Sequence, residues 1–142
     1  MTGQTATADV DISASPAQVW HALTDPELIA RYFFGARVDT SWEPGSTITW
    51  SGEYDGRSYQ DHGTVLTCKP EQLLEMTHFS PLSGLTDEPQ NHHRLRFELT
   101  EEGTTTHVHL EQDNNRSADE AQASQENWRT VLGNLKELVE RG

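Results

Sequence analysis

The 142-residue sequence has one cysteine, Cys68, and only ten basic residues against 23 acidic ones. A lone cysteine excludes an internal disulfide and fits a reducing compartment, so a cytoplasmic protein is expected. The formal net charge of −13 repels phosphate backbones and anionic membrane surfaces, and the sequence holds no basic patch. Neither nucleic acid nor a membrane is therefore expected as a partner.

Long apolar runs and nucleotide-binding motifs are also missing. No apolar stretch approaches the roughly 20 residues of a membrane span, and residues 1–5 lack the basic and apolar segments of a secretory signal. There is no GxGxxG, no P-loop and no Gly-x-Ser-x-Gly motif, so no cofactor is expected. The length predicts a single domain over residues 8–142, preceded by a disordered segment over residues 1–7.

Capping signals and hydrophobic periodicity predict the order of the elements. Residues 8–14 alternate as a half-buried strand does. Ser15-Pro16-Ala17-Gln18 then predicts a helix start, and Thr24-Asp25-Pro26-Glu27 predicts a second short helix. A period of two predicts six further strands, over residues 38–42, 47–54, 59–68, 73–79, 93–100 and 105–112. Residues 80–91 form an unusually long loop, and such loops tend to be functional or mobile.

A third capping signal, Ser117-Ala118-Asp119-Glu120, predicts the start of a long C-terminal helix. Its apolar residues recur at spacings of three and four, which indicates one face packed on a sheet: Trp128, Val131, Leu132, Leu135, Leu138 and Val139. The predicted order is strand, two helices, six strands and a helix. A curved sheet closed by this helix leaves a concave apolar space that suits a small molecule.

The segment from Ile12 to Glu27, ISASPAQVWHALTDPE, resembles the opening signature of AHSA1-type proteins. These are homologues of the C-terminal domain of the Hsp90 ATPase activator, within the START-like (SRPBCC) superfamily that also holds polyketide cyclases and Bet v 1. Further matches are YFFG at 32–35, WEPGS at 42–46, GTVL at 63–66 and the terminal helix from Trp128 to Leu138.

This resemblance implies the helix-grip (START-like) fold, an α+β fold. In it a curved antiparallel sheet wraps around a long C-terminal helix, with two short helices after the first strand. Members of the superfamily often bind hydrophobic small molecules between sheet and helix. The eukaryotic activator also has an N-terminal domain that helps engage Hsp90. This sequence has no room for one, which makes chaperone binding a less favoured expectation.

The expected ligand-binding residues are those predicted to face the concave space. His78 shares a strand face with two apolar residues, so it could orient a polar ligand group or act as a general acid or base. A histidine hydrogen-bonded at a strand end is the structural alternative, and large apolar residues are also the ordinary filling of a core. The predicted set is Phe33, Phe34, Trp50, Met76, His78, Phe97, Trp128 and Leu132.

The seven histidines raise the question of a metal site. His107 and His109 lie on one face of a strand, with His92 and His93 on the neighbouring strand, and such a cluster could bind a transition metal. That face should point to solvent, because Val108 lies on the opposite one. Neither cysteine nor a tight carboxylate set completes a coordination sphere in the sequence, so no metal is expected.

The leading interpretation is a protein that binds a small apolar or amphipathic molecule in the cavity. The alternatives are an enzyme of cyclase, dehydratase or hydrolase type, using His78 with a tyrosine or carboxylate in the same cavity, and a module that interacts with Hsp90. A homodimer formed through a sheet edge is left open. The strand faces around Val65 to Cys68 are ambiguous, because a bulge there would exchange them.

Overall fold

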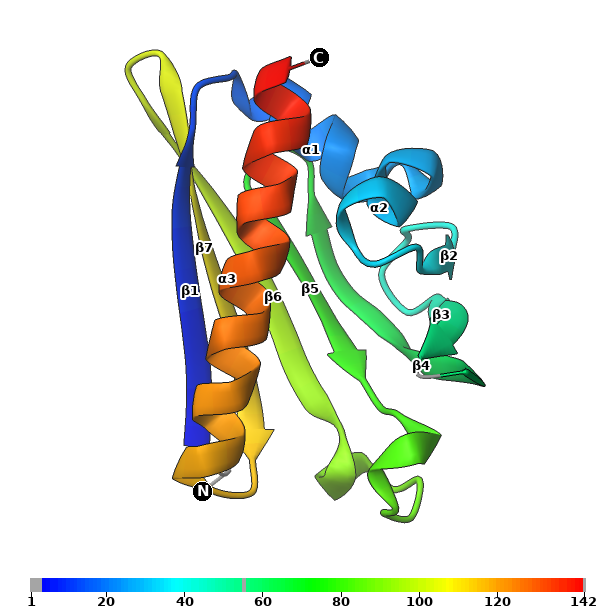
Figure 1. The fold of residues 1–142 in the computed structure, drawn as a ribbon. Helices are drawn as coiled ribbons and strands as arrows, with labels where there is room; N and C mark the ends of the chain where they lie inside the picture. The colour runs from blue at the N-terminus through cyan, green and yellow to red at the C-terminus, as the bar shows by residue number, and fades with distance from the viewer. Residues whose placement is uncertain (1–3, 55, 142) are drawn as a thin grey trace.

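In the computed structural model, the described residues 4–54 and 56–141 form a seven-stranded antiparallel sheet that wraps around one long helix (Figure 1). The strands lie in the order β1-β7-β6-β5-β4-β3-β2. Their bounds are β1 (Gln4–Ile12), β2 (Arg37–Asp39), β3 (Thr47–Tyr54), β4 (Arg57–Lys69), β5 (Leu73–His78), β6 (His93–Glu102) and β7 (Thr105–Asn115). The predicted element order and the α+β helix-grip fold are confirmed.

Side-chain caps begin the three helices, which are α1 (Pro16–Thr24), α2 (Pro26–Tyr32) and α3 (Ala118–Arg141). The Ser15 Oγ accepts from the backbone N–H of Gln18 at 3.2 Å, and the Gln18 Oε1 accepts from the Ser15 N–H at 3.1 Å. This reciprocal pair is the predicted capping box. Asp25 caps α2 through its Oδ1, and the Oγ of Ser117 accepts from the backbone at the start of α3.

The core lies between α3 and the concave face of the sheet, where α3 packs chiefly along β1 (Figure 1). Alternate residues of the strands and one face of α3 supply it, as their periodicities predict. The largest fully buried apolar side chains are Ile12, Val19, Ile48, Val65, Leu74, Val108, Leu110, Val131, Leu132 and Leu135. None of the described helices is both long and apolar enough to cross a membrane.

Several strand boundaries differ from the predicted ones, most clearly the start of β1 and the end of β2. β1 begins at Gln4, whereas residues 4–7 were expected to be disordered; the Gln4 carbonyl accepts from the Asn115 side chain at 3.0 Å, so β7 holds this end. Residues 1–3 lie outside the described residues. β2 ends at Asp39 rather than at Trp42. Trp42 itself has a φ of +65°, a left-handed conformation that cannot belong to a strand.

The ambiguity around Val65 has a structural cause. The register of β4 against β5 shifts between Val65 and Thr67, which places the extra residue of a β-bulge at Leu66. Val65 is fully buried, whereas Leu66 is 41% exposed. Two adjacent apolar residues therefore point to opposite faces, and the bulge sets which of them enters the core.

Candidate functional site

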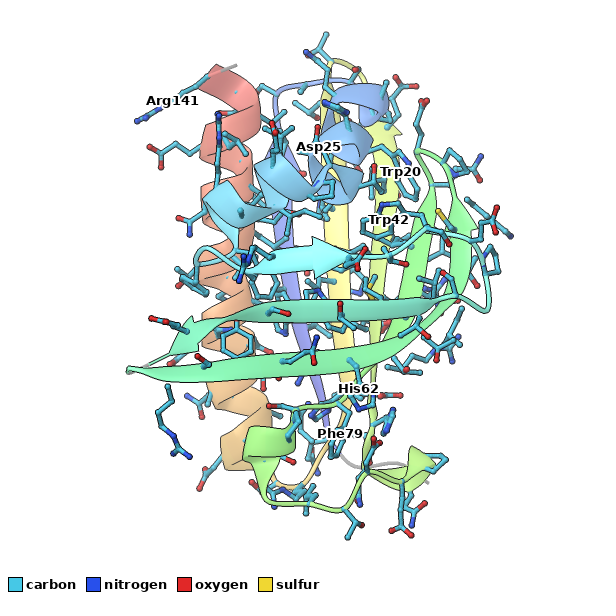
Figure 2. All side chains as sticks on the ribbon, turned by 90° about the vertical axis from the view of Figure 1, so that its right-hand side faces the viewer. Trp20, Asp25, Trp42, His62, Phe79 and Arg141 are labelled. Atoms are coloured by element: carbon cyan, nitrogen blue, oxygen red, sulfur yellow. The ribbon has the colours of Figure 1, made fainter. Side chains whose placement is uncertain are left out.

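A cavity of about 150 Å³ lies at the end of the sheet away from α1 and α2. Phe79 marks this end in Figure 2, and Trp20 and Asp25 mark the opposite one. The end of β5, the loop over residues 80–91, and the start of α3 form its walls. Its lining residues are His78, Phe79, Ser80, Ser83, Leu85, Gln90, Asn91, His93, Asn114, Arg116 and Glu120. A cavity of this volume holds a benzene-sized group.

His78 is the last residue of β5, where it faces a cavity and is also hydrogen-bonded. It lines the cavity, and its Nε2 lies 2.9 Å from the Oδ2 of Asp61 on β4. Asp61 pairs with Trp50 across β3 and β4. The Trp50 ring meets the His78 ring edge-on, at 4.9 Å between centroids. Three neighbouring strands thus hold the imidazole in one orientation.

The Asp61 carboxylate determines the tautomer of the neutral His78 ring. A carboxylate only accepts hydrogen bonds, so the His78 Nε2 carries the hydrogen and Nδ1 is the acceptor of the neutral ring. The second oxygen of Asp61, Oδ1, is buried and has no hydrogen-bond partner among the described residues. Burial, and then the negative charge of Asp61, raise the pKa of nearby Tyr59. The Asp61–His78 pair can orient a polar ligand or move a proton.

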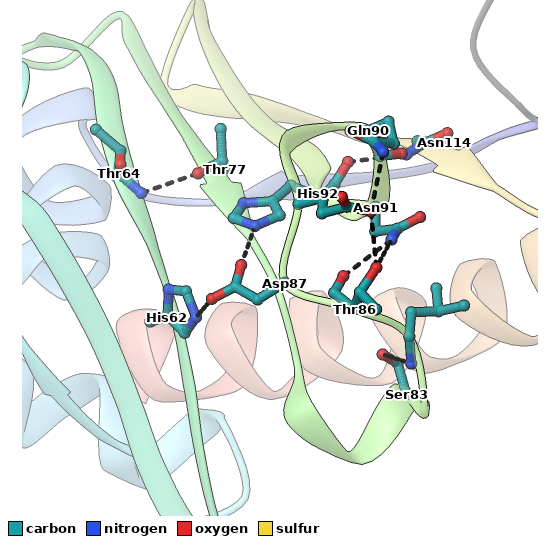
Figure 3. Close-up of polar contacts among 12 residues, drawn as sticks. His62, Thr64, Thr77, Ser83, Thr86, Asp87, Gln90, Asn91, His92 and Asn114 are labelled. Carbon is teal, nitrogen blue, oxygen red and sulfur yellow. Dashed lines mark hydrogen bonds and ion pairs between the residues drawn. The ribbon is translucent and has the colours of Figure 1, made fainter.

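The carboxylate of Asp87 anchors the loop that walls the cavity (Figure 3). Its Oδ2 lies 2.9 Å from the Nε2 of His62 on β4, and its Oδ1 lies 2.7 Å from the Nε2 of His92. The ring of His92 stacks on Phe79, at 5.1 Å between centroids. The hydrogen bond with His92 is the main reason that the pKa of Asp87 is lowered.

Two asparagine side chains fix the same loop (Figure 3). The Nδ2 of Asn114 on β7 donates to the carbonyls of Gln90 and His92, at 2.8 and 2.9 Å. Within the loop, the Nδ2 of Asn91 donates to the carbonyl of Thr86 at 2.9 Å. The loop over residues 80–91 therefore lies against β4 and β7 through specific polar contacts, although its sequence has little apolar content.

Most of the predicted ligand-binding residues lie in the packed core. Of the predicted set, His78 lines the cavity described above, and the other members do not. The Trp128 indole donates to the Gln112 Oε1 at 2.6 Å, and its ring contacts Phe33 and Phe97 at centroid distances of 5.5 and 6.2 Å. The buried members of the set are Trp50, Met76, Phe97, Trp128 and Leu132. Their part in binding stays a prediction.

The expected inward orientation of Phe34 is wrong. Its side chain is 58% exposed, because the chain turns sharply where α2 ends. Phe34 has a φ of +52° and Gly35 a φ of +78°, and the Gly35 N–H donates to the carbonyl of Ala30 at 2.9 Å. Two successive left-handed residues close the helix and send the Phe34 ring outward.

The histidines do not form the single cluster considered from the sequence. His107 and His109 lie on the outer face, as predicted, but His93 stacks on His78 at the cavity and His92 contacts the loop. No tight carboxylate set was expected beside these histidines, but two aspartates of β1 lie within hydrogen-bond distance of His107. These aspartates are far from it in sequence, and only the pairing of β1 with β7 brings them together.

Sequence reasoning also missed Asp61 and Asp87. Neither residue belongs to a motif, and each has its partners on another strand or loop. The alternation of β4 indicated that Asp61 shares a face with Tyr59, but nothing in it showed that the end of β5 lies alongside. The pairing of β4 with β5 was the missing information.

Known proteins place the chain in a family. The family model described as activator of Hsp90 ATPase homolog 1-like protein matches residues 13–140. The solution structure of ChR145 from Cytophaga hutchinsonii is 39% identical, with a TM-score of 0.86, and the match covers 99% of this chain and 97% of that one. No curated protein matches the chain significantly.

Two further structures share the fold at lower identity. CalU16 from Micromonospora echinospora is 21% identical, with a TM-score of 0.75, over 95% of this chain and 75% of that one. The Aha1 dimer from Colwellia psychrerythraea is 20% identical, with a TM-score of 0.72, over 96% of each chain. At such identities the likeness shows the fold alone. The family model and the 39% identity establish that this chain belongs to the family of activator of Hsp90 ATPase homolog 1-like proteins.

Proposed function

We propose that the protein binds a small, partly apolar molecule whose polar group hydrogen-bonds to His78. The observation that carries the proposal is the position of His78 in the cavity wall, held by Asp61 through one ring nitrogen. Phe79 and Leu85 supply an apolar part of the lining, and the other lining residues are polar, so a ligand with both an apolar and a polar part fits this cavity.

The cavity volume of about 150 Å³ suits a group of benzene size. A longer molecule would extend from it along the concave face toward Trp50 and Trp128. Such a molecule would contact the inward aromatic residues of the predicted set, and these side chains would have to move aside to admit it. The loop over residues 80–91 would act as the gate, with Asp87 as its anchor.

Native mass spectrometry of the protein purified gently from its own host tests this proposal. We expect a reproducible extra mass that disappears on denaturation. His78→Gln should lose that mass, because it removes the imidazole that is proposed to bind the polar group of the ligand. His21→Gln is the matched control, since His21 is 68% exposed and pairs with Asp25 at 3.4 Å. A mass retained equally by both variants would remove His78 from the binding site.

A second candidate function is an enzyme that uses the same cavity. It is favoured by the Asp61–His78 pair, because a general base needs a group that orients it, and Tyr59 adds a hydroxyl nearby. With the ligand identified, Asp61→Asn should leave its binding within a few-fold of wild type while product formation falls. Unchanged product formation would exclude the pair from catalysis.

The remaining expectations on partners and location stay predictions. The structure from Colwellia psychrerythraea is described as a dimer, which supports testing this chain for a homodimer by light scattering. The family description mentions the Hsp90 ATPase, so the same experiment with added Hsp90 tests the interaction alternative. A cytoplasmic location rests on the lone cysteine.

A further inference from the structure

The outer face of the sheet carries a second group of imidazoles and carboxylates. On β7, His107 and His109 point away from the core, because Val108 between them is fully buried. β1 pairs with β7 so that Asp11 lies opposite His107 and Asp9 lies opposite His109. The acidic face of β1 therefore meets the histidine face of β7, on the side of the sheet that α3 does not cover.

His107 lies between two of these carboxylates. Its Nδ1 is 2.7 Å from the Oδ1 of Asp11, and its Nε2 is 2.8 Å from the Oδ2 of Asp9. Glu102, at the end of β6, brings a third carboxylate to His107. One ligand atom each of Asp11, Glu102 and His107 lies within 4.8 Å of the other two.

We propose that Asp11, Glu102 and His107 bind one divalent transition-metal ion of the Zn²⁺ type. Imidazole nitrogen and carboxylate oxygen both bind Zn²⁺, at about 2.0–2.2 Å. Small rotations of these exposed or half-exposed side chains bring three atoms within 4.8 Å of one another to those distances. The Nδ1 of His107 is the ligand atom, and water completes the coordination sphere.

Asp9 supplies the second contact that metal-binding histidines need. Such a histidine almost always donates its other ring N–H to a carboxylate, a carbonyl or water, which fixes the ring and its tautomer. The Oδ2 of Asp9 does this for the Nε2 of His107, and it also lies 2.7 Å from the Nδ1 of His109. The imidazole in the set favours transition metals over Mg²⁺ and Ca²⁺, which prefer oxygen ligands.

A bound ion would join three strands. Asp11 belongs to β1, Glu102 to β6 and His107 to β7, and β1 is an edge of the sheet. Because an ion that binds only the folded chain stabilises it, Zn²⁺ should raise the unfolding temperature. The site is on the outer face, so it does not depend on the ligand proposed for the cavity.

Isothermal titration of Zn²⁺ into the untagged full-length chain tests the site, with Mg²⁺ titrated in parallel. We expect His107→Gln and Glu102→Gln each to lose one Zn²⁺ equivalent. Asp9→Asn should weaken binding about 10–100-fold, the usual effect of removing an orienting partner. His21→Gln, which removes an exposed histidine beside an aspartate elsewhere, should bind as wild type does.

Several outcomes would overturn the proposal. Absence of Zn²⁺ binding to the wild-type chain, or equal binding by His107→Gln and Glu102→Gln, would remove the site. If His109→Gln loses the ion while Glu102→Gln keeps it, the ligand set is wrong. Mg²⁺ bound as tightly as Zn²⁺ would contradict the metal class. Unchanged circular dichroism of the variants shows that loss of binding is not loss of the fold.

Discussion

Gly63 lies where β4 and β5 approach so closely that no side chain fits. A Cβ at this position would lie 1.8 Å from the carbonyl oxygen of Thr77 and 2.6 Å from its carbonyl carbon. Both are backbone atoms, so Gly63→Ala must push β4 away from β5. The neighbouring hydrogen bond from the Thr64 N–H to the Thr77 Oγ1, at 2.9 Å, would break as well (Figure 3).

The expected loss of stability lies at the upper end of the range for overpacking. Adding a methyl group to a packed site costs typically 1–3 kcal/mol and occasionally more, and a backbone carbonyl cannot rotate aside as a side chain can. We therefore expect about 3 kcal/mol. For a urea m-value of about 2 kcal/mol/M, this lowers the unfolding midpoint by about 1.5 M. The same displacement separates Asp61 from His78, so ligand binding should also weaken.

Urea unfolding followed by circular dichroism measures the effect, with Gly133→Ala as the matched control. A Cβ at Gly133, inside α3, would meet nothing within 4 Å, and alanine in a helix interior is favoured over glycine by about 0.5–1 kcal/mol. The same substitution should thus raise the midpoint at one site and lower it at the other. A wild-type midpoint for Gly63→Ala would refute the reasoning from the close approach.

Three further predictions concern the loop, the core and a helix cap. Because the hydrogen bond with His92 lowers the pKa of Asp87 in the folded protein, the loop anchor should be complete above the unfolded value near 3.9 and be lost as the pH falls through the lower folded value. Hydrogen–deuterium exchange of the loop amides measures this pH dependence, and Asp87→Asn should abolish it. Trp128→Phe leaves the buried Gln112 Oε1 without its indole donor and should cost about 1–3 kcal/mol, seen by calorimetry; an unchanged melting temperature would contradict this. Ser15→Ala should cost about 1 kcal/mol in urea unfolding.

The candidate site could be predicted only in part. Alternation along β5 indicated that Met76 and His78 face inward, and they do so in the structure. It could not separate cavity from core, because the same apolar side chains line both. Trp128 fills the space under the sheet, and its contacts with Phe33 and Phe97 depend on how three elements pack together.

Capping signals and hydrophobic periodicity in the sequence determined the order of the elements, the cap at Ser15 and the outward orientation of His107. Each of these depends on neighbours within one helical turn or one strand. Only the tertiary structure decided which side chains meet. Asp61 reaches His78 across 17 positions, and Asp11 reaches His107 across 96. Such pairs depend on the order and register of strands, which are set by the burial of the whole sheet against α3, so no segment of the sequence specifies them by itself.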